Sequence, residues 1–333
     1  MNRKKLINFY LKIRRGLFLI INFFFLNPVN LEVFKRVAMY GYGSDKCLKK
    51  GFLPLPVHFY SPIPDIEDLE KRKIWDKKSE LKGIDFNQKK QLILLKILGR
   101  KYYQECRWPL NPTKNPADFF IDNSGFSFGC AAILYTMIRE FKPHRIFEIG
   151  SGNSSQVIFQ AIRTNQKENQ INKTSYTIID PYPGRYVINR EVKYNRLIKK
   201  RVELMNPVIF NELGKNDILF IDSSHTSKIG SDVNFLYLDI LPRLRPGVII
   251  HIHDINLPYE YSKNYATSEC FRQFWNEQYL LQSFLTYNHN FEILLAMGYI
   301  MVDHLKDFKL AFPTYDSKIH ELSSGSFWMR KSR

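Results

Sequence analysis

The stretch RIFEIGSGNSSQV, residues 145–157, constrains the fold more than any other part of the chain. An apolar run typical of a buried strand ends in Gly-Ser-Gly, and residues with helical spacing follow directly. A strand, a glycine turn and a helix in this order predict a crossover of a parallel sheet. The carboxylate of Glu148 stands just before the glycines, so the ligand of this turn has to be compatible with a negative charge.

Strands and helices alternate over the second half of the sequence. The predicted strands are residues 144–150, 175–180, 200–205, 216–222, 248–254, 291–296 and 325–331. The predicted helices are residues 87–103, 130–141, 153–164, 231–244 and 268–285. We therefore expect an α/β fold with a doubly wound, mostly parallel seven-stranded sheet of Rossmann-like type. Ligands of such sheets bind at the carboxyl ends of the strands.

The first part of the chain differs in composition from the rest. Eleven basic and two acidic residues in the first 50 positions contribute +9 of the net charge of +17. The apolar run at residues 16–26 is too short to cross a hydrocarbon core, which needs about 20 residues. We expect residues 1–30 either to lie on an anionic membrane surface or to pack as a helix on the main domain. Residues 31–124 are predicted to form an N-terminal helical extension or cap, and residues 125–333 the catalytic domain.

Two classes of protein are disfavoured by composition. The four cysteines are scattered without a C-x-x-C pair, which argues against a zinc ribbon and favours a reduced, cytoplasmic chain. The basic excess does not continue beside aromatic residues in a recognisable module, so no nucleic-acid partner is expected.

The glycine turn favours a cationic ligand over a pyrophosphate. A dinucleotide fingerprint requires a third glycine where this chain has Ser155, and the Walker lysine is missing. A carboxylate favours a cation, and glycines allow the backbone to approach closely. Asp180 ends the next strand, where an acid can bind both hydroxyls of a ribose. S-Adenosylmethionine, a sulfonium amino acid joined to a nucleoside, meets both requirements.

A second group of polar residues ends two later strands. Asp222 and His225 follow one strand, and His253 and Asp254 end the next. Because neighbouring strands lie about 4.8 Å apart, these side chains could surround one cavity. Two carboxylates with imidazoles suit Mg²⁺ or a base that activates a hydroxyl. Three interpretations stay open: a metal with a base, a base without a metal, or structural helix capping with a core histidine.

Four segments of the chain together resemble class I S-adenosylmethionine-dependent methyltransferases, close to the sugar and macrolide-sugar O-methyltransferases. They are FEIGSGNSSQV, IIDPYP, LFIDSSHTSKIGSDV and LRPGVIIHIHDI, and the resemblance covers roughly residues 125–331. It implies that His225 is the catalytic base and that Asp222, also catalytic, binds a metal together with Asp254. Related enzymes often carry a second polar ligand directly after that position, where this chain has Ile255, so either His253 or Asn256 is expected to serve as the further metal ligand, or the metal is absent. It implies cofactor contacts at Glu148, Gly150, Ser151, Gly152, Ser154 and Asp180, with Ser155 nearby.

Other interpretations of these residues remain. Glu148 could merely cap the following helix, and His251 with His253 could bind zinc or iron, although His251 is expected to face packed helix. The loop after Asp254 is predicted to close over the substrate, with Tyr259, Tyr261 and Trp275 as stacking surfaces, whereas Glu277 and Gln278 are expected only to stabilise a helix. We expect an O-methyltransferase acting on a sugar, glycan precursor or related small molecule. The alternatives are an NAD(P)-dependent nucleotide-sugar oxidoreductase and a catalytically silent binding protein.

Overall fold

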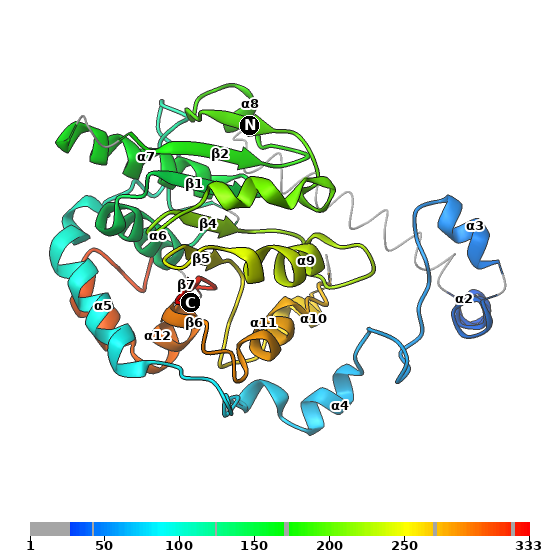
Figure 1. The fold of residues 1–333 in the computed structure, drawn as a ribbon. Coiled ribbons are helices and arrows are strands. Elements are labelled where there is room, and N and C mark those ends of the chain that lie inside the picture. The colour runs from blue at the N-terminus through cyan, green and yellow to red at the C-terminus, as the bar shows by residue number, and fades with distance from the viewer. Residues whose placement is uncertain (1–26, 42, 124, 170–172, 269–271, 321–323) are drawn as a thin grey trace, which may run out of the picture. The chain divides into compact units, whose positions relative to one another are not determined.

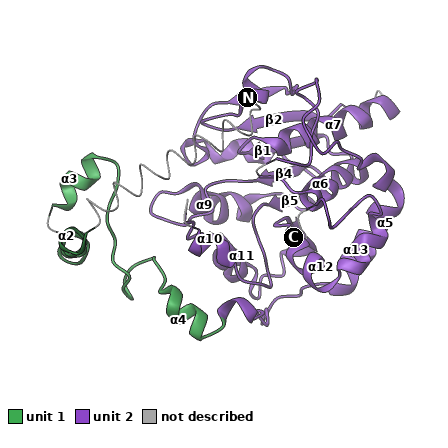
Figure 2. Ribbon diagram, turned by 180° about the vertical axis from the view of Figure 1, so that it is seen from behind, with its two compact units in different colours: residues 1–73 green, residues 74–333 purple. Residues whose placement is uncertain are grey.

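A computed structural model describes residues 27–41, 43–123, 125–169, 173–268, 272–320 and 324–333. The chain divides into two compact units, residues 1–73 and 74–333 (Figure 2). Almost all of the expected membrane-surface segment, residues 1–30, lies outside the described residues. In the described part of the chain, no helix is both long enough and apolar enough to span a membrane.

The first unit contributes three described helices: α2 (Pro28–Tyr40), α3 (Ser44–Lys49) and α4 (Ile66–Lys71). Helix α2 has a capped first turn, because the Asn27 side chain accepts a hydrogen bond from Asn30 N and Pro28 occupies the first helical position. Gly41 ends it in the left-handed region with φ +73°. No residue of α2 is buried, although most of its side chains are apolar.

The second unit is built around one seven-stranded sheet with flanking helices (Figure 1). Its order is β3-β2-β1-β4-β5-β7-β6; the first five strands are parallel, and β7 runs antiparallel to both of its neighbours. This confirms the predicted mostly parallel sheet. The strands are β1 (Arg145–Ile149), β2 (Ser175–Ile179), β3 (Arg196–Ile198), β4 (Ile218–Ile221), β5 (Ile249–Ile252), β6 (Phe291–Ala296) and β7 (Phe327–Lys331).

The helices of this unit are mostly short. The α-helices are α5 (Gln88–Tyr102), α6 (Phe128–Phe141), α7 (Asn153–Glu168), α8 (Arg185–Ile188), α9 (Asp232–Phe235), α10 (Lys263–Thr267), α11 (Glu277–Leu285), α12 (Met297–Asp303) and α13 (Leu305–Ala311). The other helical elements are the 3-10 helices η1 (Ile74–Asp76), η2 (Tyr103–Glu105), η3 (Val202–Leu204), η4 (Pro207–Glu212) and η6 (Leu241–Arg243), and the π-helix η5 (Leu236–Ile240). Helix α6 packs against α7 and α5, and α5 packs against α13 and β6.

The central strands are buried on both faces, which is why their sequences are continuous apolar runs. Every residue of β4 and β5 is buried, including His251. The His251 ring stacks on Phe220 at 4.3 Å and lies 4.6 Å from Trp328. Burial holds the pKa of His251 well below its usual value, so the ring is neutral. His251 is therefore a core residue, packed between aromatic side chains of the neighbouring strands.

Three predicted elements differ from the structure. The strand expected at residues 200–205 is instead β3 at 196–198, because only that segment pairs with β2 and three basic residues then lead away from the sheet. The helix expected at 231–244 is broken into α9, η5 and η6. The helix expected at 268–285 begins only at Glu277, because the backbone N–H groups of Asn276 and Glu277 donate to the carbonyl of His225.

Candidate functional site

Four residues singled out in the sequence follow the carboxyl ends of four parallel strands. Gly150 follows β1, Asp180 follows β2, Asp222 follows β4, and Asp254 lies two residues beyond β5. Since these strands are parallel, their carboxyl ends lie at the same edge. The structure therefore gathers the predicted residues where a ligand of this sheet type would bind.

Gly150 is required by both the conformation and the space at its position. Its φ of +80° lies in the left-handed region, and a Cβ atom would stand 2.0 Å from the backbone carbonyl oxygen of Asp222. A backbone atom cannot move aside as a flexible side chain can. The turn after β1 and the end of β4 are thus in direct contact, and only glycine allows it.

Glu148 is fully buried and bound by protein hydroxyl groups. Ser154 Oγ and Ser155 Oγ donate to its two oxygens at 2.7 and 2.8 Å, and the Tyr176 hydroxyl donates to it as well. Burial raises the pKa of this carboxyl to about 7, despite these hydrogen bonds. The carboxyl group ties the first turn of α7 to the sheet, and its direct contact with a cofactor stays a prediction.

Asp180, at the end of the neighbouring strand β2, forms hydrogen bonds with the glycine turn. Its Oδ2 accepts hydrogen bonds from the backbone N–H and the hydroxyl of Ser151 at 2.8 and 2.7 Å, and its Oδ1 accepts one from Tyr182 N at 2.7 Å. Asp180 also lines a cavity of about 540 Å³, which we call the glycine cleft. Its other lining residues are Ile149, Gly150, Ile179, Pro181, Tyr182, Arg201, Val202, Glu203, Asp222, Ser223, Ser224, Lys228, Ser231 and Asp232. Nothing lies within 4 Å of a Cβ built on Gly152, so that position opens onto free space.

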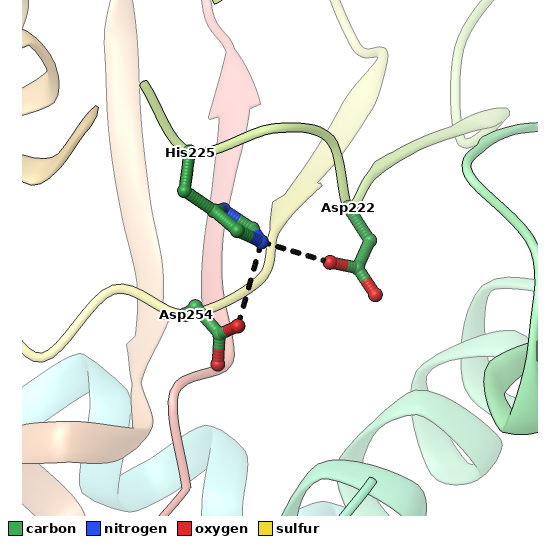
Figure 3. Close-up of side chains that lie close together, drawn as sticks. All are labelled: Asp222, His225 and Asp254. Atoms are coloured by element: carbon green, nitrogen blue, oxygen red, sulfur yellow. Dashed lines mark ion pairs between the residues drawn. The ribbon is translucent and has the colours of Figure 1, made fainter. Parts of the chain in front are cut away.

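Asp222, His225 and Asp254 form one cluster (Figure 3). His225 Nε2 lies 3.2 Å from Asp222 Oδ1 and 3.4 Å from Asp254 Oδ2. Both His225 and Asp254 have a φ of +56°, which is unusual for residues with a side chain. Backbone conformations of this kind persist only where the surroundings enforce them, and they concentrate at functional sites.

The charges of the cluster stabilise one another. Burial lowers the pKa of His225, but hydrogen bonds to Asp222 and Glu277 outweigh it and raise that pKa to about 10. Burial raises the pKa of Asp222, but the nearby imidazoles of His253 and His225 bring it below its usual value. With these partners alone, His225 therefore holds its proton at neutral pH.

The donor set fits a divalent cation. Asp222, His225 and Asp254 each offer one ligand atom, and these atoms lie within 4.8 Å of one another. The carboxylate oxygens of such a set suit Mg²⁺ or Mn²⁺. His253 stands beside this group, with Nδ1 3.3 Å from Asp254 Oδ1 and 3.7 Å from Asp222 Oδ1. Its ring also stacks on Phe126, with centroids 5.0 Å apart.

A second cavity, of about 530 Å³, is lined by Asp254 of this cluster and by His253. We call it the aromatic pocket. Its lining residues are Leu110, Ile121, Asp122, Asn123, Gly125, Phe126, Ser127, Phe128, Cys130, His253, Asp254, Asn256, Ser262, Tyr265, Gln273, Trp275, Ile319 and Gly325. Trp275 lines this pocket as the stacking prediction requires, together with Tyr265, which the sequence argument did not single out. Tyr259 and Tyr261 do not belong to the lining: the Tyr259 hydroxyl donates to Asp303, and Tyr261 is buried.

Comparison with known proteins supports one of the expected functions. A family model described as a methyltransferase domain matches residues 147–255, from β1 to the residue after Asp254. An uncharacterized protein of Archaeoglobus fulgidus is 34% identical over 184 residues, which make up 52% of this chain and 80% of that protein. This chain belongs to the class I S-adenosylmethionine-dependent methyltransferases. S-Adenosylmethionine is the usual cofactor of such domains, and the match favours methyl transfer over the oxidoreductase and silent-protein alternatives.

One contact in this methyltransferase was missed by sequence reasoning. Glu277, the first residue of α11, is fully buried, and its Oε2 lies 2.8 Å from His225 Nδ1. The two residues are 52 positions apart. The only signal in the sequence was an acid within the polar loop after Asp254, and we interpreted it as part of a longer helix.

The raised pKa of Glu148 leads to a test of its role in the fold. A carboxyl group whose pKa is higher in the folded than in the unfolded chain stabilises the fold below the unfolded value and loses that effect as the pH rises through the folded value. We expect the free energy of unfolding of the wild type, relative to Glu148→Gln, to fall between about pH 4.5 and about pH 7. Urea denaturation at half-unit pH intervals measures the difference. A difference that is constant or grows over this range would contradict the assignment.

Proposed function

We propose that this methyltransferase transfers a methyl group from S-adenosylmethionine to a hydroxyl oxygen of a sugar, glycan precursor or related small molecule. The observation that carries the proposal is the position of the cluster between two cavities. Asp222 lines the glycine cleft, Asp254 lines the aromatic pocket, and His225 lies within 3.4 Å of a carboxylate oxygen of each. A cofactor in the glycine cleft and an acceptor in the aromatic pocket would therefore meet at these three side chains.

We assign the cofactor to the glycine cleft. Gly150 lets the backbone approach the ligand, and Asp180 has the position of an acid that binds ribose hydroxyls. Residues Val202 and Glu203 line the same cleft beyond β3. S-Adenosylmethionine supplies a methyl carbon on a positive sulfur and leaves as S-adenosylhomocysteine. Ser151, Gly152 and Ser154 would lie beside its amino-acid part.

His225 is the proposed base. An alcohol becomes a good nucleophile only as its proton leaves, so a base within hydrogen-bond reach of the acceptor oxygen is needed. The acceptor proton passes to His225 Nε2 while the new O–C bond forms and the S–C bond breaks. The His225 side chain is nearly buried, which limits the access of water to the reacting atoms.

Asp222 and Asp254 are the proposed ligands of a divalent cation such as Mg²⁺, with His253 beside them. A cation here would lower the pKa of a bound hydroxyl and offset the negative charge that keeps the proton on His225. The pKa of His225, raised to about 10 by its carboxylate neighbours, is what makes this compensation necessary. Without it His225 would carry a proton already and could not accept another.

The lining of the aromatic pocket supports an uncharged hydroxyl compound as acceptor. The ring centroids of Tyr265 and Trp275 are 4.8 Å apart, and the ring planes are inclined at 62°. Asn256 and Gln273 in the same lining offer neutral hydrogen-bonding groups. Among its described lining residues there is no lysine or arginine, although the chain carries a net charge of +17. A phosphate or carboxylate on the acceptor would find no lysine or arginine there to pair with.

Replacing the proposed base separates catalysis from cofactor binding. We expect His225→Ala to lower methyl transfer about 10²- to 10⁴-fold, the usual contribution of general base catalysis. Its affinity for S-adenosylhomocysteine should change little, because His225 does not line the glycine cleft. Calorimetric titration measures that affinity, and transfer of radiolabelled methyl groups to a panel of glycosides measures activity. His289→Ala, which removes an exposed histidine, is the control. An equal loss of cofactor affinity, or unchanged transfer, would contradict the proposal.

We also propose that the N-terminal unit associates peripherally with an anionic membrane surface. Residues 1–15 are basic, and α2 continues this character with Lys35 and Arg36. No residue of α2 is buried, and Val29 and Tyr40 are 73% and 69% exposed. An amphipathic helix with basic residues on its polar side binds at lipid interfaces. A lipid-linked glycan precursor would suit an enzyme held at such a surface.

Sedimentation with lipid vesicles tests this association. The protein should bind phosphatidylglycerol vesicles more strongly than phosphatidylcholine vesicles, and the binding should weaken as salt is added, because each basic residue near the surface contributes about 1 kcal/mol. Phe34→Glu in α2 should reduce binding, whereas Leu204→Glu, at an exposed apolar position of the second unit, should not. Equal binding to both kinds of vesicle would refute the electrostatic part of the proposal.

A further inference from the structure

Glu277 and the two residues before it all contact His225. The carboxylate of Glu277 contacts Nδ1 of the imidazole, while Nε2 faces Asp222 and Asp254. The ring of Trp275 lies 4.5 Å from the same imidazole, tilted by 52°. The two ring nitrogens of His225 therefore have different partners. The partner of Nδ1 is the first residue of α11, two positions after Trp275, which lines the aromatic pocket.

The same segment also fixes the backbone of His225. Asn276 N and Glu277 N donate to the carbonyl oxygen of His225 at 3.1 and 3.3 Å. Asn276 Oδ1 accepts a hydrogen bond from Ser227 N at 2.6 Å, and Asn276 Nδ2 donates to Ser227 O at 3.3 Å. These bonds explain how His225 keeps its left-handed φ of +56°, which costs free energy that the surroundings have to supply.

We propose that Glu277 is the positioning residue for His225, and that residues 275–277 link the lining of the aromatic pocket to the base; this inference rests on the proposed function. A histidine that binds a metal or moves a proton commonly donates its other ring N–H to a carboxylate, which fixes the ring orientation and tautomer. The Nδ1–H of His225 donates to Glu277, which leaves Nε2 directed at the reacting atoms. Trp275 lines the aromatic pocket, so a ligand that contacts Trp275 also contacts the segment that holds the base.

The burial of Glu277 supports a specific role. Its side chain has no exposed surface, and besides His225 it interacts with the buried hydroxyl of Tyr237. Burial raises the pKa of this carboxyl, as expected for a charge removed from water. An acid placed there only to begin α11 would keep its oxygens in solvent or on backbone N–H groups. Glu277 instead directs one oxygen at His225.

Nuclear magnetic resonance of protein with ¹⁵N-labelled histidine tests the inference without an acceptor. The chain has eight histidines, and a His225→Asn spectrum identifies the signals of His225 by difference. At one fixed pH with saturating Mg²⁺, the wild type should show a resolved, slowly exchanging Nδ1 proton on His225. We expect Glu277→Gln to shift this resonance and Glu277→Ala to abolish it.

Glu260→Gln is the matched control. It removes the same charge from the stretch that precedes α11, where Glu260 bonds to Tyr279, Gln278 and Tyr261 N and does not contact His225. Its His225 resonance should match the wild type. If Glu277→Gln leaves the resonance unchanged while lowering the unfolding midpoint, Glu277 has only a structural role and the inference fails.

Steady-state kinetics provide an independent test once an acceptor substrate has been identified. Loss of a carboxylate that orients a metal-bound or proton-accepting histidine typically costs 10- to 100-fold. We expect Glu277→Ala to lower kcat by this factor with the KM for S-adenosylmethionine nearly unchanged, and Glu277→Gln to recover part of the loss. Failure of the wild type to bind S-adenosylhomocysteine would overturn the proposed function. A normal His225 resonance in the Glu277 variants would overturn only the positioning role.

Discussion

The contact between Gly150 and the backbone carbonyl of Asp222 is the constraint on which the site depends. A Cβ at position 150 would stand 2.0 Å from that oxygen, so the turn after β1 can rest on the end of β4 only through a glycine. This contact makes one cavity wall from both strands, because Gly150 and Asp222 each line the glycine cleft. Asp222 consequently stands at the boundary between the cleft and the cluster that contains His225 and Asp254.

At this boundary the positive charge of His225 is balanced by neighbouring carboxylates. Asp222, Asp254 and Glu277 surround His225, and each lies within hydrogen-bonding or ion-pairing distance of a ring nitrogen. Removing one partner of the buried His225–Glu277 pair would cost several kcal/mol, because it would leave the other charge buried alone, whereas Asp222 and Asp254 are only half-buried. Three loops meet here, after β4, after β5 and before α11. Residues of these loops also line the two cavities. A ligand that moves the lining of the aromatic pocket would therefore move groups that contact His225 directly.

The sequence predicted the sheet because its signals are local. The apolar runs and glycine turn identify strands and crossovers without knowledge of their partners, and parallel strands bring Gly150, Asp180, Asp222 and Asp254 to one edge. What the sequence could not provide are contacts between distant segments. Glu277 reaches His225 across 52 positions, in a segment whose apolar spacing predicted an uninterrupted helix. The sequence also did not show which groups contact Glu148. An acid at the end of a strand can bind a ligand or protein hydroxyl groups, and the choice depends on side chains from other elements. In the structure, three hydroxyl groups donate to it.

The central claim is that Asp222, His225 and Asp254 form a cation-binding reaction centre between a cofactor cleft and an acceptor pocket. Crystals of the protein grown with Mn²⁺ and S-adenosylhomocysteine, measured at the manganese absorption edge, test it most directly. We expect an anomalous peak among these three side chains, with the sulfur of the ligand in the glycine cleft facing it. A manganese peak elsewhere with none at this cluster, or the nucleoside bound in the aromatic pocket, would contradict it.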